Sequence, residues 1–451
     1  MKKNNKILII IGVLLMNVFV LYMIGQSFLG GTSEYEKALA EARTYAEKEL
    51  CSKAIDKYND AIAIKDTLDV RIEMIGVYEK GMNIGEFVNT YDIFNAVKYI
   101  TEDYREDAAA YEQACDFFLR YGKYDECATA LMQARELKVT SDKISEQREL
   151  VRYKYERRYS MYETVLPCFD GYFTVSAEGE YSYLDGEASP CSDGAYTYLS
   201  SVSEGYAFAK ATHPDGTEKS FVIDTEEQRQ VYIDGAESSS GIGAGVDADG
   251  ERVLLLSCRI GDRYKYFRAD GGEAFGDYVF AGRFRNNVAA VKDGENSWKL
   301  INGTGNAVTE TVFTDVVLNE FDECAPKGII IADDGSGYRL YNHEGKPIGD
   351  FTCDGAKAFV DSLAAFKSGD KWGFVDAEGN IVISAQYDDA KSFSNGMGAV
   401  KNGEDWSFIN SKNETVIEEK FEDVGYLNAE GVCFVKIDGY WSELEFYYTG
   451  E

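Results

Sequence analysis

Histidine is the residue that most often carries acid–base chemistry, and this chain has only two. His213 lies in the segment Ala-Thr-His-Pro-Asp-Gly, and His343 lies in Tyr-Asn-His-Glu-Gly. Both segments are typical of turns. Because neither histidine has a nucleophile motif nearby, the sequence gives no Ser-His-Asp or Cys-His arrangement. We therefore expect no catalytic residues, no cofactor and no enzyme activity.

The candidate metal ligands are also weak. Asp247-Ala248-Asp249-Gly250 resembles part of a calcium loop, but the downstream bidentate glutamate is not in the required place. No zinc-ligand spacing occurs, and we expect no metal site. The nine cysteines include no Cys-x-x-Cys pair. We interpret them as reduced buried thiols, and the alternative is one bridge between Cys168 and Cys191.

The charge balance limits the partners of this protein. Acidic residues number 78 against 46 basic ones, which gives a net charge of −32. This excess argues against nucleic-acid binding, which needs cationic patches. It favours a soluble body that remains monomeric through self-repulsion. So many carboxylates ensure some close pairs, and a carboxylate-dependent hydrolase therefore stays open as an alternative.

A motif recurs from about Tyr181 to the C-terminus. Because it makes up most of the chain, the structure it forms must hold any functional side chains in place. The clearest copies are residues 371–383 and 405–417, which lie 34 residues apart. In each copy a second aromatic residue follows the first after 15 residues. Short β-compatible runs alternate with glycine turns, which predicts about eight antiparallel units over residues 165–451. The signature residues are Trp298, Phe313, Tyr338, Trp372, Gly373, Tyr387, Trp406 and Phe421.

The strongest copy resembles the WG-repeat family of bacterial proteins. The matching residues are Lys371-Trp372-Gly373-Phe374-Val375-Asp376, Gly379, Ile381-Val382-Ile383 and Tyr387-Asp388. This resemblance implies a β-repeat interaction module without catalytic residues. We expect a closed β-propeller, because closure removes unpaired strand edges, and an open β-solenoid is the alternative. The repeated Trp residues should pack between sheets, or else form an exposed row that stacks on sugars.

The N-terminus carries a predicted membrane anchor. Three lysines within residues 1–6 precede Ile7 to Gly25, a run whose only strongly polar member is Asn17. As a helix this run is long enough for a bilayer core of about 30 Å. The positive-inside rule then predicts a cytoplasmic N-terminus and an extracellular remainder. The alternative is a cleaved signal peptide and secretion.

Residues 33–160 form a separate predicted domain. This segment contains no proline and has helical periodicity, seen in Ala54, Ile55, Tyr58 and Ala61. The stretches Tyr121 to Cys127 and Ala130 to Leu137 resemble parts of tetratricopeptide repeats, which implies an all-α array of helical hairpins.

Taken together, these features predict a non-catalytic, membrane-anchored scaffold or recognition protein of a bacterial cell envelope. We expect it to bind protein partners through repeat surfaces. A module that binds cell-wall polysaccharide is the first alternative, and the carboxylate-dependent hydrolase is the second.

Overall fold

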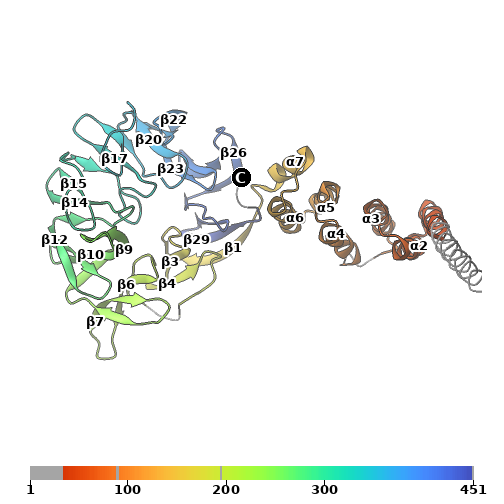
Figure 1. The fold of residues 1–451 in the computed structure, drawn as a ribbon, viewed down its shortest axis with the longest axis horizontal. Helices are drawn as coiled ribbons and strands as arrows, with labels where there is room; N and C mark the ends of the chain where they lie inside the picture. Colours follow the sequence, from red (N-terminus) through yellow and green to blue (C-terminus); the bar gives the residue numbers. More distant parts are fainter. Residues whose placement is uncertain (1–33, 88–90, 193–195, 449–451) are drawn as a thin grey trace, which may run out of the picture. The chain divides into compact units, whose positions relative to one another are not determined.

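The computed structural model describes residues 34–87, 91–192 and 196–448, and the chain divides into two compact units between Arg152 and Tyr153. The first unit is helical and the second consists of β-sheets (Figure 1). The predicted order of a helical region followed by a β region is confirmed.

The helical unit is a succession of short helices, each packed on the next in sequence. It is helical at residues 34–47 and continues through α2 (Cys51–Ile64), α3 (Leu68–Asn83), α4 (Tyr91–Asp103), α5 (Ala108–Arg120), α6 (Tyr124–Glu136) and α7 (Asp142–Val151). Small side chains such as Ala54 and Ala61 are fully buried, which allows close helix packing. Its assignment to the tetratricopeptide class stays a prediction.

None of the helices in the described ranges combines the length and apolar character needed to cross a membrane. The anchor predicted at Ile7 to Gly25 and the cytoplasmic segment 1–6 lie outside those ranges.

The β unit contains eight antiparallel sheets arranged in a ring, which are the blades of a propeller (Figure 1). The first four blades comprise β2 (Thr164–Val165), β3 (Tyr172–Ala177) and β4 (Glu180–Asp185); β5 (Tyr198–Leu199), β6 (Tyr206–Thr212), β7 (Glu218–Asp224) and β8 (Gln230–Tyr232); β9 (Ala236–Val246), β10 (Arg252–Ile260), β11 (Arg263–Arg268) and β12 (Glu273–Tyr278); and β13 (Phe280–Ala281), β14 (Ala289–Gly294) and β15 (Ser297–Ile301). In each of these four blades the strand that comes first in sequence lies innermost (Figure 1).

The remaining blades repeat this meander. They comprise β16 (Asp315–Val316), β17 (Ile329–Asp333) and β18 (Tyr338–Asn342); β19 (Gly355–Ala356), β20 (Ala364–Ser368), β21 (Lys371–Val375) and β22 (Ile381–Tyr387); β23 (Asp389–Ser394), β24 (Met397–Asn402), β25 (Asp405–Ile409) and β26 (Thr415–Phe421); and β27 (Asp423–Val424), β28 (Val432–Ile437) and β29 (Tyr440–Phe446).

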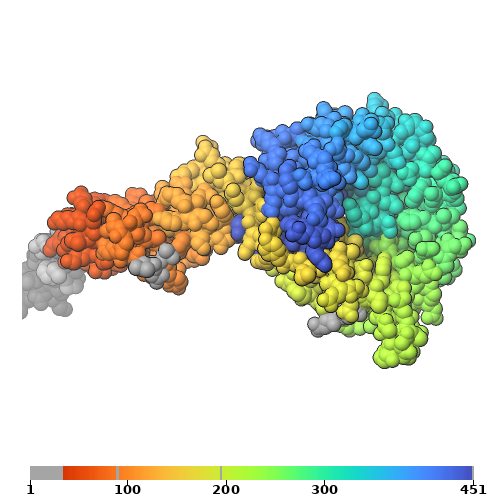
Figure 2. All heavy atoms as spheres, turned by 180° about the vertical axis from the view of Figure 1, so that it is seen from behind, coloured from red at the N-terminus to blue at the C-terminus, as the bar shows by residue number. Residues whose placement is uncertain are grey.

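The ring is closed by a strand from the start of the β unit. Strand β1 (Tyr155–Tyr162) pairs antiparallel with β29 and so becomes the outermost strand of the eighth blade. The Tyr155 ring packs on Phe446, with 5.5 Å between ring centroids, and its hydroxyl donates to Glu419 Oε2 at 2.8 Å. Figure 2 shows this contact of the yellow and blue segments. The predicted closed propeller is confirmed, and the open solenoid is not formed.

One boundary differs from the sequence-based prediction. The predicted helical domain, 33–160, includes residues 155–160, which contain neither proline nor glycine. They belong to β1 instead. The reason is a long-range one: the partner strand β29 lies at the other end of the unit, and no local pattern shows this pairing.

The repeated acidic and amide residues of the motif hold its turns. The side-chain Oδ1 of Asp376 accepts hydrogen bonds from the amides of Glu378 and Asn380, and Asn410 does the same for Lys412 and Glu414. These Asx turns fix the hairpin that follows each signature aromatic. Equivalent turns occur at Asp185, Asn302 and Asn342.

Candidate functional site

The signature aromatics build the blades and do not meet at one site. Residues 15 apart are cross-strand neighbours in the outer part of several blades, as in Trp372 opposite Tyr387 and Trp406 opposite Phe421. Isolated bridges give the same pairing for Trp298 with Phe313 and for Tyr338 with Cys353. The spacing found in the sequence is therefore the register of an outer hairpin.

The tryptophans do not form a row of open ring faces. Trp298 and Trp406 are only 8% and 5% exposed, and Trp372 is partly buried. A lysine ammonium lies over each ring, as in Lys357 over Trp372 at 5.2 Å from the centroid. Gly373 follows Trp372 at a point where a Cβ atom would lie 2.4 Å from the Ile383 carbonyl oxygen. These contacts are those of packed structural residues.

The other candidates from the sequence are scattered. His213 is partly buried and its ring contacts the Tyr232 hydroxyl at 3.1 Å, whereas His343 is exposed in a separate turn. Asp247 accepts from the amides of Asp249 and Glu251 and so forms an Asx turn. The cysteines in the described ranges are all free, so Cys168 and Cys191 are not bridged. Those ranges contain no group of three or more potential metal ligands among Asp, Glu, His and Cys.

The loop at residues 317–328 in the fifth blade, hereafter the crossbar, reaches across the centre of the ring. It joins the innermost strand β16 to β17 and is longer than its counterparts at 282–288 and 357–363. Its Phe321 packs edge-on against Phe169 of the first blade, with centroids 4.6 Å apart. Its Glu320 accepts a hydrogen bond from the Tyr426 hydroxyl of the eighth blade at 2.9 Å. The crossbar therefore links blades that are far apart in sequence.

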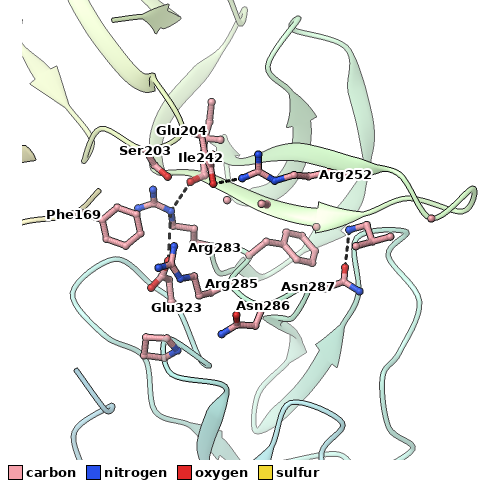
Figure 3. Close-up of a pocket in the computed structure, with 17 residues that line it drawn as sticks. Phe169, Ser203, Glu204, Ile242, Arg252, Arg283, Arg285, Asn286, Asn287 and Glu323 are labelled. Atoms are coloured by element: carbon pink, nitrogen blue, oxygen red, sulfur yellow. Dashed lines mark hydrogen bonds and ion pairs between the residues drawn. The ribbon is translucent and has the colours of Figure 1, made fainter. Parts of the chain in front are cut away.

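A cavity of about 450 Å³, hereafter the arginine pocket, lies beside the crossbar and is formed by loops of the first five blades (Figure 3). Its lining includes Phe169, Arg252, Arg283, Arg285 and Glu323. A second cavity of about 550 Å³ adjoins it and shares Phe169, Arg285 and Glu323. The two adjoining cavities lie between the inner parts of the blades, and we refer to them together as the mouth of the central channel.

Arg283 is the most deeply buried charge at this mouth. Its guanidinium lies 4.0 Å from the Phe169 ring centroid, its Nε donates to the Ile242 carbonyl at 2.6 Å, and one Nη donates to Ser201 Oγ at 2.7 Å. Burial lowers the pKa of Arg283 to about 10, so the group stays protonated at neutral pH. Its second Nη has no hydrogen-bond partner within the described part of the chain.

Glu323 supplies an incomplete counter-charge. Its Oε1 lies 3.8 Å from Arg283 Nε and makes no hydrogen bond within the described residues, whereas Oε2 accepts from Asn319 Nδ2 at 3.0 Å. Burial raises the pKa of Glu323, against the smaller opposing effect of Arg283. The neutral acid is thus favoured here relative to an exposed glutamate, which leaves the Arg283 charge less compensated.

Arg285 is a partly exposed charge of the pocket that lacks a close ion pair. Its side chain is 40% exposed, and its guanidinium lies 5.3 Å from the same Phe169 ring centroid. One Nη is 3.9 Å from Asp170 Oδ1, too far for a hydrogen bond. Asp170 in turn accepts from Ser203 Oγ and the Glu204 amide. Within the described ranges the Arg285 guanidinium therefore has charged and aromatic neighbours but makes no hydrogen bond.

Sequence analysis missed this pocket because its residues break the repeat. Arg283 stands at the position that Ala358 and Ser392 occupy in later blades, where the residue is small and buried. Gly282 replaces the lysine that lies over the tryptophan in those blades, and a Cβ there would lie 2.6 Å from the Asp322 carbonyl oxygen. The sequence signal for the pocket was therefore the pair Gly282-Arg283, which stands where later repeats have a lysine followed by a small residue.

A known repeat family matches the later blades of the β unit. Residues 338–372, 372–405 and 406–441 match the family described as WG containing repeat. The chain contains WG repeats. The matched WG repeats cover the fifth to eighth blades, whereas the arginine pocket draws mainly on the first five, where the pattern has diverged.

Solved structures with a similar chain path include BamB from Moraxella catarrhalis, at 11% identity and a TM-score of 0.41, covering 65% of this chain and all of that one. The WD40 domain of SCAP from fission yeast matches at 9% identity and the same TM-score, covering 65% of this chain and 98% of that one. No curated protein matches the WG-repeat chain by sequence.

The pKa of Glu323 gives a test of this site. Because the folded-state pKa is raised, the neutral acid stabilises the fold below the ordinary value of 4.5, and this stabilisation is lost as the pH rises through the folded pKa. Glu323→Gln removes that titration. The melting temperature of the wild type minus that of the variant should therefore fall as the pH is raised above the ordinary glutamate pKa of 4.5. A difference that increases with pH would show that pairing with Arg283 outweighs burial.

Proposed function

We propose that this chain is a non-catalytic recognition protein whose propeller binds a partner at the mouth of the central channel. The observation that carries this proposal is the convergence of five blades on the arginine pocket, where Arg285 presents a half-exposed guanidinium without a hydrogen bond. Side chains that the WG repeats use for structure are engaged in packing or turns. The pocket residues lie outside that repeated framework, and among them Arg285 has a guanidinium that makes no hydrogen bond within the described residues.

The crossbar supports the same proposal. A loop that enters a channel places backbone and side-chain groups where a partner can reach them from one face. Phe169 and Phe321 pack on each other and on the arginines, which holds these groups in place before a partner arrives. Such pre-organisation reduces the entropy lost on binding.

We also propose that the chain is anchored in a bacterial membrane by residues 7–25, with the propeller outside the cell. The basic residues before this run and the apolar run itself support the orientation. Protease added to intact cells should then degrade the propeller while a cytoplasmic control protein survives. Protection of the propeller in intact cells, followed by cleavage after lysis, would contradict this orientation.

Site-specific photo-cross-linking tests where recognition occurs. A benzoylphenylalanine at Arg252, an exposed pocket residue, should give a discrete adduct in cells. The same group at Ile381, which is 56% exposed on the outer strand β22, serves as the matched control and should give none. An adduct from Ile381 alone, or no adduct from either position, would remove the channel mouth as the binding surface.

A further inference from the structure

The charge of the arginine pocket is opposite to that of the chain around it. Its lining has three arginines, Arg252, Arg283 and Arg285, against two carboxyl groups, Glu204 and Glu323. The whole chain has 78 acidic and 46 basic residues. A local excess of positive charge, inside a strongly acidic protein, focuses attraction for anions on one place and repels them elsewhere.

Most charges of the pocket already have partners, and this singles out Arg285. Arg252 pairs with Glu204, and Arg283 is held by the Ile242 carbonyl and Ser201. Arg285 has only a distant ion pair, and its guanidinium presents a planar fork of donors to the pocket. The nearby buried charge of Arg283, which Glu323 compensates incompletely, adds to the positive potential at that fork.

The surrounding carboxyl groups limit which anion fits. Asp170 lies 3.9 Å from Arg285, and Glu204 and Glu323 line the same cavity. These groups repel a dianion such as a phosphate ester more strongly than a single planar carboxylate, which carries half the charge. A carboxylate also matches the guanidinium fork in a bidentate geometry.

We propose that the arginine pocket binds a carboxylate group of the partner polypeptide, with Arg285 as the direct contact and Arg283 as a buried charge that strengthens the site. The carboxylate comes from a chain terminus or from an acidic side chain, and the two share the same chemistry. This inference rests on the proposed recognition function and specifies its ligand.

Calorimetric titration of the full-length protein tests the inference with defined probes. N-acetylglycylglycine represents a terminal carboxylate, N-acetylglutamic acid α-amide represents a side-chain carboxylate, and N-acetylglycylglycinamide is the neutral control. We expect at least one acid to bind with a Kd on the order of 1 mM, with no heat from the neutral control. The tighter acid identifies the source. Equal binding of the amide, or tighter binding of inorganic phosphate, would overturn the proposal.

Two variants assign the contact to Arg285. Arg285→Gln should weaken binding of the acid by roughly 10- to 100-fold, because a charge-assisted hydrogen-bond pair is lost. Arg229→Gln removes an exposed arginine outside the pocket and should leave the affinity unchanged. Arg285→Lys keeps the charge without the fork, and we expect a partial loss; it serves if the glutamine variant melts early. Wild-type affinity in both Arg285 variants would contradict the assignment.

The two proposals fail in different ways. If the adduct at position 252 forms but no carboxylate probe binds, the pocket recognises another chemistry and only this inference is lost. If a carboxylate binds but no adduct forms at that position, the ligand site stands and recognition of a partner at the channel mouth is lost.

Discussion

The pairing of β1 with β29 is the interaction on which the β unit depends. Without β1 the eighth blade would lose its outermost strand, and the main-chain ladder that joins the start of the β unit to its last blade would be absent. The main-chain ladder from Tyr155 to Arg158 joins the two ends of the unit, and the Tyr155–Phe446 contact adds buried aromatic area. Pairing β1 with β29 closes a loop of nearly the whole β unit. The conformational entropy lost on this closure is offset by contacts within the eighth blade.

Closure has a direct consequence for the centre of the ring. Blades that are far apart in sequence are fixed opposite one another, and the space between them must be filled by groups from their inner loops. The crossbar does this through Phe321 and Glu320, which contact Phe169 and Tyr426 from the first and eighth blades. Without a fixed ring these contacts would not form, and the arginine pocket beside them would lose one wall.

The burial of Arg283 shows how function and stability are connected here. A buried ion pair with imperfect geometry contributes little to stability, since the desolvation of both groups offsets their attraction. The Arg283–Glu323 pair has a 3.8 Å separation and two atoms without hydrogen bonds. A small apolar residue avoids this desolvation, as Ala358 does at the equivalent position of the sixth blade. Retaining the charge fits a role in shaping the potential at the channel mouth.

The sequence predicted what is repeated and missed what is unique. The period of the motif, its glycine turns and the spacing of Trp372 and Tyr387 follow from local pairing, so the number and strand pattern of the blades could be inferred. Strand β1 could not, because its partner is distant and its own residues lack turn signals. Arg283 and the crossbar were missed because a search for the common repeat pattern does not detect residues that depart from it.

Removing the closing strand alone is the most direct test of this account. A chain of residues 153–451 retains β1, and a chain of residues 163–451 lacks it, while both keep the remaining strands of the β unit. Their thermal unfolding can be compared together with their binding of N-acetylglycylglycine. The account predicts a lower melting temperature, a broader transition and loss of binding in the shorter chain. Equal melting temperatures and equal binding would show that the ring holds its shape, and its channel mouth, without β1.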